Sequence, residues 1–281
     1  NSEEVKKLLP KKLAICVTFY YTEEKINILK KVCKEFNSLA HDVDVTIVTN
    51  EKNDKKIINL KKNIEEVLKN FNIYSVQDLQ HPKFLPWSHL VVMRKKIHDN
   101  SFTHFMYLED DIRVTKKNII YWLNARNALK VYSLIPSFVR TEINFENKEV
   151  YVVDSTKKSN FKKMPKVFSK NNDIAFVNLL FPHQPIYFYD KELMNEYFNG
   201  PASDPDFAIP AAKDYYQGVV ERLDYMLTYH NVPKGFFHRA VAPVNIKNKI
   251  IKDYCLVEHL SNKYANQNSK FAVIKVKDLF Y

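Results

Sequence analysis

Two different spacings of apolar residues alternate along the first 110 positions of the chain. Short apolar or alternating runs predict strands, and apolar residues repeated every three or four positions predict helices. The predicted strands cover residues 13–19, 43–49, 73–76 and 104–108, and the predicted helices cover residues 23–40, 54–71 and 87–98. Because strands and helices alternate, we expect the α/β class: an αβα sandwich with a mostly parallel central sheet.

The second half of the chain has a less regular pattern. We expect helices at residues 117–132, 190–198 and 213–229, with a Pro-rich connector at 201–210 before the last of them. Residues 133–190 read as strands and loops, and the polar stretch 155–173 is expected to be a mobile loop. No shift in composition marks a boundary, so we expect one domain over residues 1–281, with a first half at 11–115 and an irregular second half at 116–281.

Three consecutive carboxylates end the fourth predicted strand. Glu109, Asp110 and Asp111 follow an apolar run, and apolar sequence resumes at Ile112. Adjacent carboxylates at a strand end repel one another, so this arrangement normally needs a cation. Hard oxygen ligands suit Mg²⁺ or Mn²⁺, bound together with the phosphates of a substrate. The alternative is a solvated acidic turn.

Polar residues also follow the first two predicted strands. They are Thr18 to Tyr21 and the pair Thr49-Asn50. In open parallel sheets, ligands bind outside the carboxyl ends of the strands. Three strand ends that meet at one edge therefore favour the functional interpretation of the acids.

Glycine is almost absent. Only Gly200, Gly218 and Gly235 occur among the 281 residues. A Gly-rich phosphate loop and a dinucleotide-binding fingerprint are therefore impossible, which excludes P-loop NTPases, kinases and standard NAD or FAD enzymes. A nucleotide that binds here must be held by side chains and a metal.

The remaining composition sets broader limits. Hydrophobic residues make up 46% of the chain, enough for a buried core, and the net charge of +11 favours anionic partners. The three cysteines lack zinc-ligand spacing and are expected to be buried free thiols in a reducing compartment. No apolar run is long enough to span a bilayer. We therefore expect a cytoplasmic protein, with peripheral membrane association compatible with its basic charge.

The acidic run belongs to a larger set of motifs. The set comprises Tyr107-Leu-Glu-Asp-Asp-Ile112, Tyr121-Trp122, Pro136-Ser-Phe-Val-Arg140-Thr-Glu142, Pro233-Lys-Gly235-Phe236, Arg239 and Val257-Glu-His259-Leu260-x-Asn262-x-Tyr264-Ala265-Asn266. From about Leu13 to Asn266 the chain resembles the nucleotide-sugar-dependent glycosyltransferases of the GT-A fold, in particular a little-characterised microbial group. The resemblance implies a nucleotide-sugar-binding half at 11–115, an acceptor-binding half at 116–281 and transfer to a glycan or lipid-linked acceptor.

The same resemblance assigns a metal site. It implies that Mn²⁺ or Mg²⁺ is held on the donor diphosphate by Asp111, with Glu109 or Asp110 assisting and with the late His259 completing the set. The acids read Glu-Asp-Asp and not a strict Asp-x-Asp, which leaves open whether Glu109 touches the metal. His259 could equally be a surface or core histidine.

Substrate contacts are expected from several segments. Thr18, Tyr20, Thr49 and Asn50 are candidates for the donor base and ribose, although ordinary capping of strand ends explains each of them singly. Before the acidic strand, Trp87, His89 and Arg94 are candidates for donor contacts; Arg94 suits a diphosphate and Trp87 could be core. Asp110 could also contact substrate, and Arg140 with Glu142 could shape the acceptor pocket.

An inverting transferase needs a base, usually a carboxylate, near the acceptor hydroxyl. By resemblance Glu221 occupies this place, with Asp214 as a second candidate; a helix-surface acid paired with Arg222 is the alternative. A retaining enzyme would need no such base.

Two other function classes stay open. A metal-dependent nucleotidyltransferase shares the metal–diphosphate chemistry but usually has a Gly-rich loop near the first strand. A nucleic-acid-binding protein agrees with the basic charge and the many aromatic residues. Those aromatics fall mostly at apolar periodic positions, however, so we expect no nucleic-acid partner. A metal phosphohydrolase would need dispersed His and Asp ligands, which the sequence lacks.

Overall fold

The computed structural model describes residues 7–208, 218–267 and 269–281, and the chain divides into two compact units. The first unit comprises Asn1–Lys116 and Pro185–Met226, and the second comprises Lys117–Gln184 and Leu227–Tyr281. The change of unit at Lys116 falls beside the expected boundary of the two halves. Residues 185–226, however, lie with the first unit.

A five-stranded sheet forms the centre of the first unit. Its strand order is β11-β4-β1-β2-β3, and all neighbouring pairs are parallel except β11 with β4. The strands are β1 (Lys12–Phe19), β2 (Asp42–Thr49), β3 (Phe71–Ser75), β4 (His104–Glu109) and β11 (Ile186–Asp190). The predicted mostly parallel sheet is confirmed, and β11 joins it from far along the chain.

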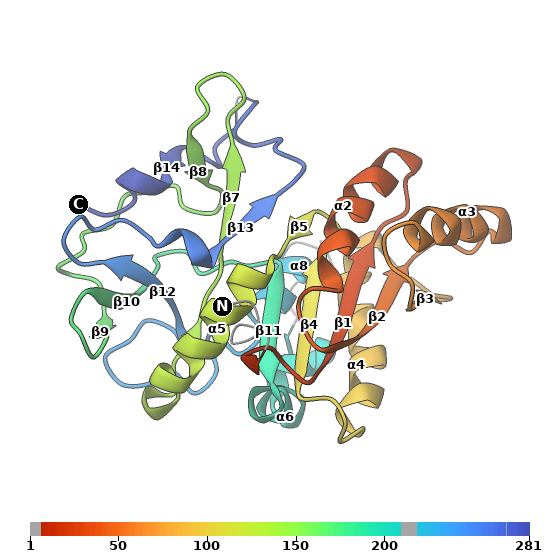
Figure 1. Cartoon of the computed structure of the whole chain (residues 1–281), viewed down its shortest axis with the longest axis horizontal. Helices are drawn as coiled ribbons and strands as arrows, with labels where there is room; N and C mark the ends of the chain where they lie inside the picture. Colours follow the sequence, from red (N-terminus) through yellow and green to blue (C-terminus); the bar gives the residue numbers. More distant parts are fainter. Residues whose placement is uncertain (1–6, 209–217, 268) are drawn as a thin grey trace. The chain divides into compact units, whose positions relative to one another are not determined.

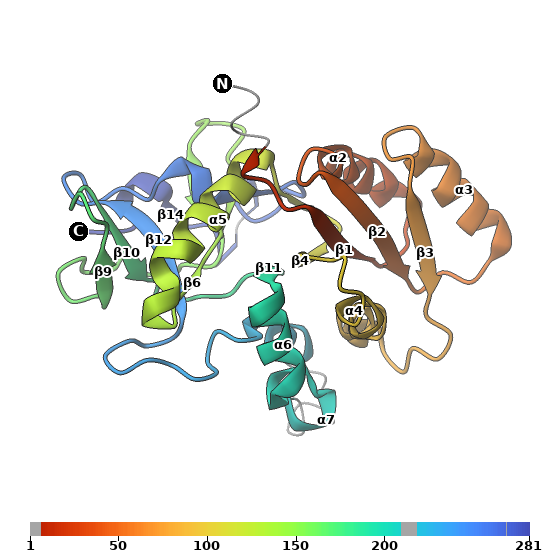
Figure 2. The ribbon, with the colours of Figure 1, turned by 60° about the horizontal axis from the view of Figure 1, so that its bottom comes forward.

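Helices cover both faces of this sheet. Figure 2 shows α2 and α3 on one face and α4 and α6 on the other, the αβα arrangement expected from the sequence. The bounds are α2 (Ile26–Phe36), α3 (Asp54–Glu65), α4 (His89–Ile97), α6 (Lys191–Asn199), α7 (Pro205–Ala208) and α8 (Val219–Tyr225), with 3-10 turns η1 (Glu23–Lys25), η2 (Pro82–Phe84), η3 (Pro86–Ser88) and η5 (Pro201–Ser203) and the short strand β5 (Ile112–Arg113). The apolar side of α2, with Leu29, Val32 and Phe36 fully buried, explains why this segment is a helix against the sheet.

The second unit contains α5 (Lys116–Leu129) and two mixed sheets (Figure 1). One sheet has the order β6-β12-β10-β9, and the other places β14, β8, β7 and β13 side by side. The strands are β6 (Ile135–Pro136), β7 (Val139–Ile143), β8 (Val150–Val152), β9 (Lys166–Phe168), β10 (Ile174–Asn178), β12 (Ala240–Asn245), β13 (Leu256–His259) and β14 (Ile274–Lys275), with 3-10 turns η4 (Lys130–Tyr132), η7 (Asp253–Cys255) and η8 (Val276–Asp278).

Several predicted elements differ in extent. The helix expected at 54–71 ends at Glu65, because the chain must turn to begin β3 at Phe71, earlier than the predicted 73–76. Of the helix expected at 213–229, the described part is α8 alone, since residues 209–217 lie outside the described ranges. The expected loop 155–173 contains β9, and it buries Ser159 and Phe161 against the chain's last residues.

The three cysteines are buried free thiols, as expected, and burial raises the pKa of each. No described helix is long and apolar enough to cross a membrane.

Candidate functional site

The carboxyl ends of β1, β2 and β4 meet at one edge of the first unit's sheet. In the strand register Thr18 lies opposite Glu109, and the next residue, Phe19, lies opposite Thr49. Parallel pairing therefore brings together three of the strand ends at which the sequence predicted ligand contacts.

Asp110 and Asp111 are buried at this edge, with 7% and 8% of their surfaces exposed. Burial, and then the negative charge of Asp111, raise the pKa of Asp110 to about 6, against the opposing charge of Lys25. The Lys25 ammonium lies 3.6 Å from Asp110 Oδ2, which makes no hydrogen bond. A positive charge at this position would therefore remove an electrostatic cost that the folded chain carries.

The acids fit one kind of divalent metal site. Among the residues described by the structure, no group of three or more His, Cys, Asp or Glu is placed to hold a metal ion. Mg²⁺, however, is usually held by one or two carboxylates, with water and substrate phosphates as its other ligands. Buried Asp110 and Asp111, with a hydrogen-bond-free oxygen on Asp110, meet that smaller requirement.

The other strand-end candidates differ in exposure. Thr18 and Thr49 are buried: Thr18 Oγ1 donates to the Tyr107 hydroxyl at 3.4 Å, and Thr49 Oγ1 accepts from the Glu51 N–H at 3.3 Å. Asn50 is half-buried, and its Oδ1 accepts from the Tyr21 N–H at 2.8 Å, which fixes the direction of its amide. Tyr20 is 42% exposed. Tyr20 and Asn50 are thus the accessible members of this group.

Trp87 and His89, predicted to contact substrate, are buried with their polar atoms engaged by the protein. Trp87 Nε1 donates to the Val219 carbonyl at 2.7 Å. His89 Nδ1 lies 2.6 Å from the Pro86 carbonyl and Nε2 lies 3.1 Å from the Tyr187 hydroxyl. Burial lowers the pKa of His89 to about 3, so the ring is neutral. Trp87 thus joins η3 to α8, and His89 joins α4 to β11.

Arg94 lies at the wrong end of its helix for the predicted diphosphate contact. Helix α4 runs antiparallel to the strands and ends shortly before β4 begins, so its last turns approach the amino edge of the sheet. Lys96 in the same turn pairs with Asp44 near the start of β2. The Arg94 guanidinium donates to the carbonyl and hydroxyl of Ser203, at 3.2 and 3.1 Å. Arg94 is therefore not part of the proposed site.

The candidates from the second unit form buried polar pairs. Arg140 makes a two-bond ion pair with Asp154, at 2.5 and 3.1 Å. Glu142 Oε1 lies 2.5 Å from His259 Nδ1. His259 Nε2 lies 3.1 Å from Ser261 Oγ. The metal ligands predicted from the sequence lie in different units: Glu109 and Asp111 are in the first, and His259 is in the second.

The candidate base Glu221 is exposed in the first turn of α8. Asp214 lies outside the described residues. One turn after Glu221, Asp224 is 3% exposed. Burial, followed by the negative charges of Asp224 and Glu109, raises the pKa of Tyr107 well above its ordinary value.

Lys25 and Asp224 were missed by sequence reasoning. Asp224 carries a usable signal, because it is an acid next to Leu223 on the apolar side of a helical pattern. Lys25 carries none, since it is one of many lysines and only the turn after β1 places it near Asp110.

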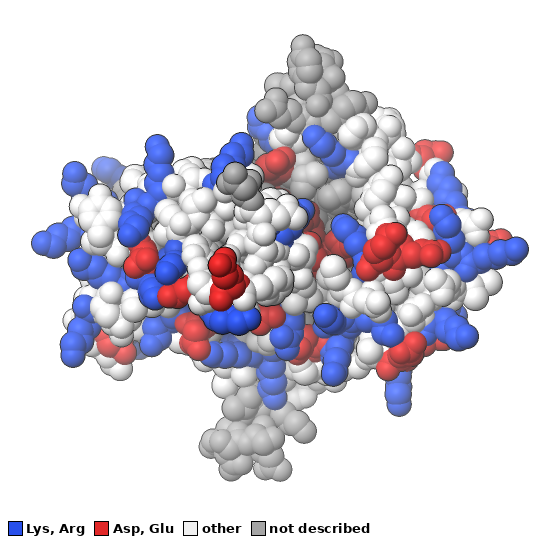
Figure 3. All heavy atoms as spheres, turned by 90° about the horizontal axis from the view of Figure 1, so that it is seen from above, with Lys and Arg blue, Asp and Glu red and all other residues white. Residues whose placement is uncertain are grey.

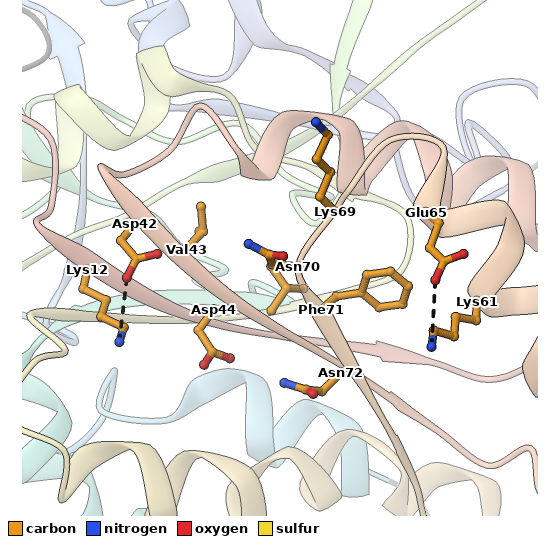
Figure 4. Close-up of a pocket in the computed structure, with 11 residues that line it drawn as sticks. Lys12, Asp42, Val43, Asp44, Lys61, Glu65, Lys69, Asn70, Phe71 and Asn72 are labelled. Carbon is orange, nitrogen blue, oxygen red and sulfur yellow. Dashed lines mark ion pairs between the residues drawn. The ribbon is translucent and has the colours of Figure 1, made fainter.

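A separate hollow of about 480 Å³ lies at the amino edge of the same sheet (Figure 4). Lysines and acids line it, in pairs such as Lys12 with Asp42 and Lys61 with Glu65. All three acids that line it are in ion pairs, and it is at the opposite edge from the buried Asp110 and Asp111.

No protein-family model and no curated protein matches this chain. Among solved structures, the crystal structure of S. aureus TarS is similar, with a TM-score of 0.40 and 14% sequence identity. The match covers 66% of this chain and 29% of that chain, so this chain spans less than a third of TarS. A likeness this distant carries no argument about activity, and the candidate function rests on the strand-end residues.

Proposed function

We propose that this protein is a metal-dependent glycosyltransferase that moves a sugar from a nucleotide-diphosphate donor to a glycan or lipid-linked acceptor. The observation that carries the proposal is the buried Asp110–Asp111 pair, which follows Glu109 at the end of β4, at the same sheet edge as the ends of β1 and β2. Burial makes this pair costly for the chain without a cation, as the raised pKa of Asp110 indicates.

Asp111, assisted by Glu109 or Asp110, is the proposed holder of Mn²⁺ or Mg²⁺. Such a metal would neutralise the negative charge that develops on the departing diphosphate. Two residues are proposed to contact the nucleoside beside the metal: Asn50, whose amide oxygen accepts from the Tyr21 N–H, and Tyr20, whose ring is exposed. Thr18 links the end of β1 to Tyr107 on β4, and Thr49 accepts from the Glu51 N–H just after β2.

Glu221 is the proposed base, and with it we propose an inverting reaction. Its exposed carboxylate can take a proton from an acceptor hydroxyl, as a general base must. The neighbouring Asp224 is buried and is not proposed as the base.

Thermal unfolding against UDP-, GDP-, CMP- and dTDP-sugars, with and without Mn²⁺, tests the donor site. A ligand that binds only the native state raises the melting temperature by mass action. We expect one nucleotide to give a Mn²⁺-dependent rise that Asp111→Asn abolishes. Asp42→Asn is the matched control, because Asp42 is an exposed acid at the opposite edge of the same sheet.

Product analysis separates this proposal from its rivals. A glycosyltransferase releases nucleoside diphosphate from the sugar donor, whereas a nucleotidyltransferase joins a nucleoside monophosphate to its partner and releases pyrophosphate. The proposal would be wrong if no nucleotide gave a thermal shift and oligonucleotides bound in a salt-sensitive way. That result would favour the nucleic-acid-binding hypothesis.

A further inference from the structure

Hydrogen bonds of the buried Asn178 link two loops of the second unit, one after β10 and one before β12. Asn178 is fully buried at the end of β10. Its Oδ1 accepts from the Phe237 N–H, and its Nδ2 donates to the carbonyls of His238 and Ala240, each at 2.9 Å. His238 Nε2 lies 2.7 Å from the Leu179 carbonyl. The segment after β10 therefore lies beside the segment before β12.

A third segment joins them. The Arg239 N–H donates to the Thr228 carbonyl at 2.8 Å, and the Tyr229 ring packs edge-on against His238. Between Tyr229 and His238 the chain makes a tight turn at Pro233–Phe236. Gly235 takes a φ of +88° there, which only glycine adopts without strain.

These fixed segments present large apolar side chains to the surface. Leu180, Phe181, Tyr229 and Phe237 are 41%, 38%, 53% and 54% exposed. We call these four residues, with Lys234 in the turn, the aromatic loop surface. Buried hydrogen bonds hold the backbone beneath it, so the loops keep these side chains at the surface although water solvates them poorly.

The aromatic loop surface has a one-sided charge. Residues 179–184 and 227–240 contain no Asp or Glu, and Lys234 is exposed. The whole chain carries +11, although Lys and Arg are interspersed with Asp and Glu on the face that Figure 3 shows. A negatively charged partner is therefore attracted, both at this surface and at longer range.

We infer that the aromatic loop surface docks the protein peripherally on an anionic lipid bilayer. Leucine and phenylalanine at loop tips gain free energy by entering the boundary between headgroups and acyl chains, tyrosine favours the same boundary, and lysine attracts anionic headgroups. A glycan would instead require many hydrogen-bonding groups around the rings. The four apolar side chains offer a single hydroxyl group, that of Tyr229, so the lipid surface fits better.

Vesicle co-sedimentation of the full chain tests this surface. The probe is vesicles of phosphatidylcholine and phosphatidylglycerol in equal parts, with pure phosphatidylcholine vesicles as the neutral comparison. We expect binding to the anionic vesicles, weaker binding to neutral ones, and a loss of roughly tenfold or more in Phe181→Ser/Phe237→Ser. Phe168→Ser is the matched control, because Phe168 is 55% exposed in the same unit but lies outside the surface.

Lys234→Glu supports the inference if it weakens binding to anionic vesicles more than to neutral ones. The inference is overturned if the parent protein does not bind, or if Phe168→Ser loses as much binding as the double variant. It is also overturned if the double variant keeps vesicle binding while losing affinity for a soluble glycan, which would make this surface a glycan site. Vesicle binding needs no sugar donor, so the result stands apart from the proposed transferase activity.

Discussion

Glu142 Oε1 and His259 Nδ1 lie 2.5 Å apart, and both side chains are almost completely buried. The other carboxylate oxygen of Glu142 accepts from the Ala265 N–H at 2.7 Å. One carboxylate on β7 thus holds both the end of β13 and the loop that follows it.

Glu142→Gln should therefore destabilise the protein. The amide keeps the size of the side chain but loses the charge on its hydrogen bonds with His259 and Ala265, which costs about 1–3 kcal/mol for a buried group. Urea denaturation would measure the fall in the free energy of unfolding. Glu146→Gln, at an exposed glutamate four residues later, is the control. Equal stability of the two variants would show that the pair contributes nothing.

Acid should destabilise the first unit through two histidines, the buried His89 and the half-buried His104. Burial lowers the pKa of His89 to about 3 and of His104 to about 4, below the value of about 6.5 in an unfolded chain. Between these values the unfolded state binds protons that the native state does not, so the free energy of unfolding falls as the pH falls below about 6.5. The expected slope is up to about 1.4 kcal/mol per pH unit for each histidine.

His104→Phe isolates one of these two contributions. Phenylalanine can keep the stacking on Phe188, at 5.2 Å between ring centroids, but cannot bind a proton. Denaturation curves at several pH values should show a flatter slope for this variant. His41→Gln, at an exposed histidine, controls for the loss of an imidazole. A slope as steep as that of the parent would contradict the assignment.

Glu221→Gln should keep donor binding and lose most turnover, by a factor of roughly 100 or more, the usual contribution of a general base. The exposed side chain predicts little change in melting temperature. Sugar transfer assays, run beside the nucleotide-induced thermal shift, separate the two effects. Glu24→Gln, an exposed glutamate in η1, serves as the comparison. Normal turnover of Glu221→Gln would remove it as the base and favour a retaining reaction.

The fold of the first unit was predictable because its signals are local. Strand and helix periods alternate from Leu13 to Leu108, and parallel pairing then follows from the connections. The acids at residues 109–111 were found because a strand ends on them. The antiparallel neighbour of β4 could not be found in this way, since residues 117–184 of the other unit separate β11 from β4 along the chain.

The roles of residues in the second unit could not be predicted either, because their partners are also far away along the chain. The motif at residues 257–266 supported the resemblance, and His259 within it stays a predicted metal ligand. The structure shows what its asparagines do: Asn262 Oδ1 accepts from the Ile143 N–H, and Asn266 Oδ1 accepts from the Phe145 N–H. These partners lie about 120 residues earlier, and no spacing within the motif reveals them.

The place of β11 in the sheet also constrains how the protein is made. When residues up to 116 have left the ribosome, β4 has β1 on one side and an open edge on the other. The strand that covers this edge is synthesised only after residues 117–184 of the other unit. Until Asp190 emerges, Phe105 and Tyr107 lie on an incomplete sheet with exposed backbone groups. The nascent chain therefore passes through a stage of high aggregation risk, and its second unit can begin to fold before the first is finished.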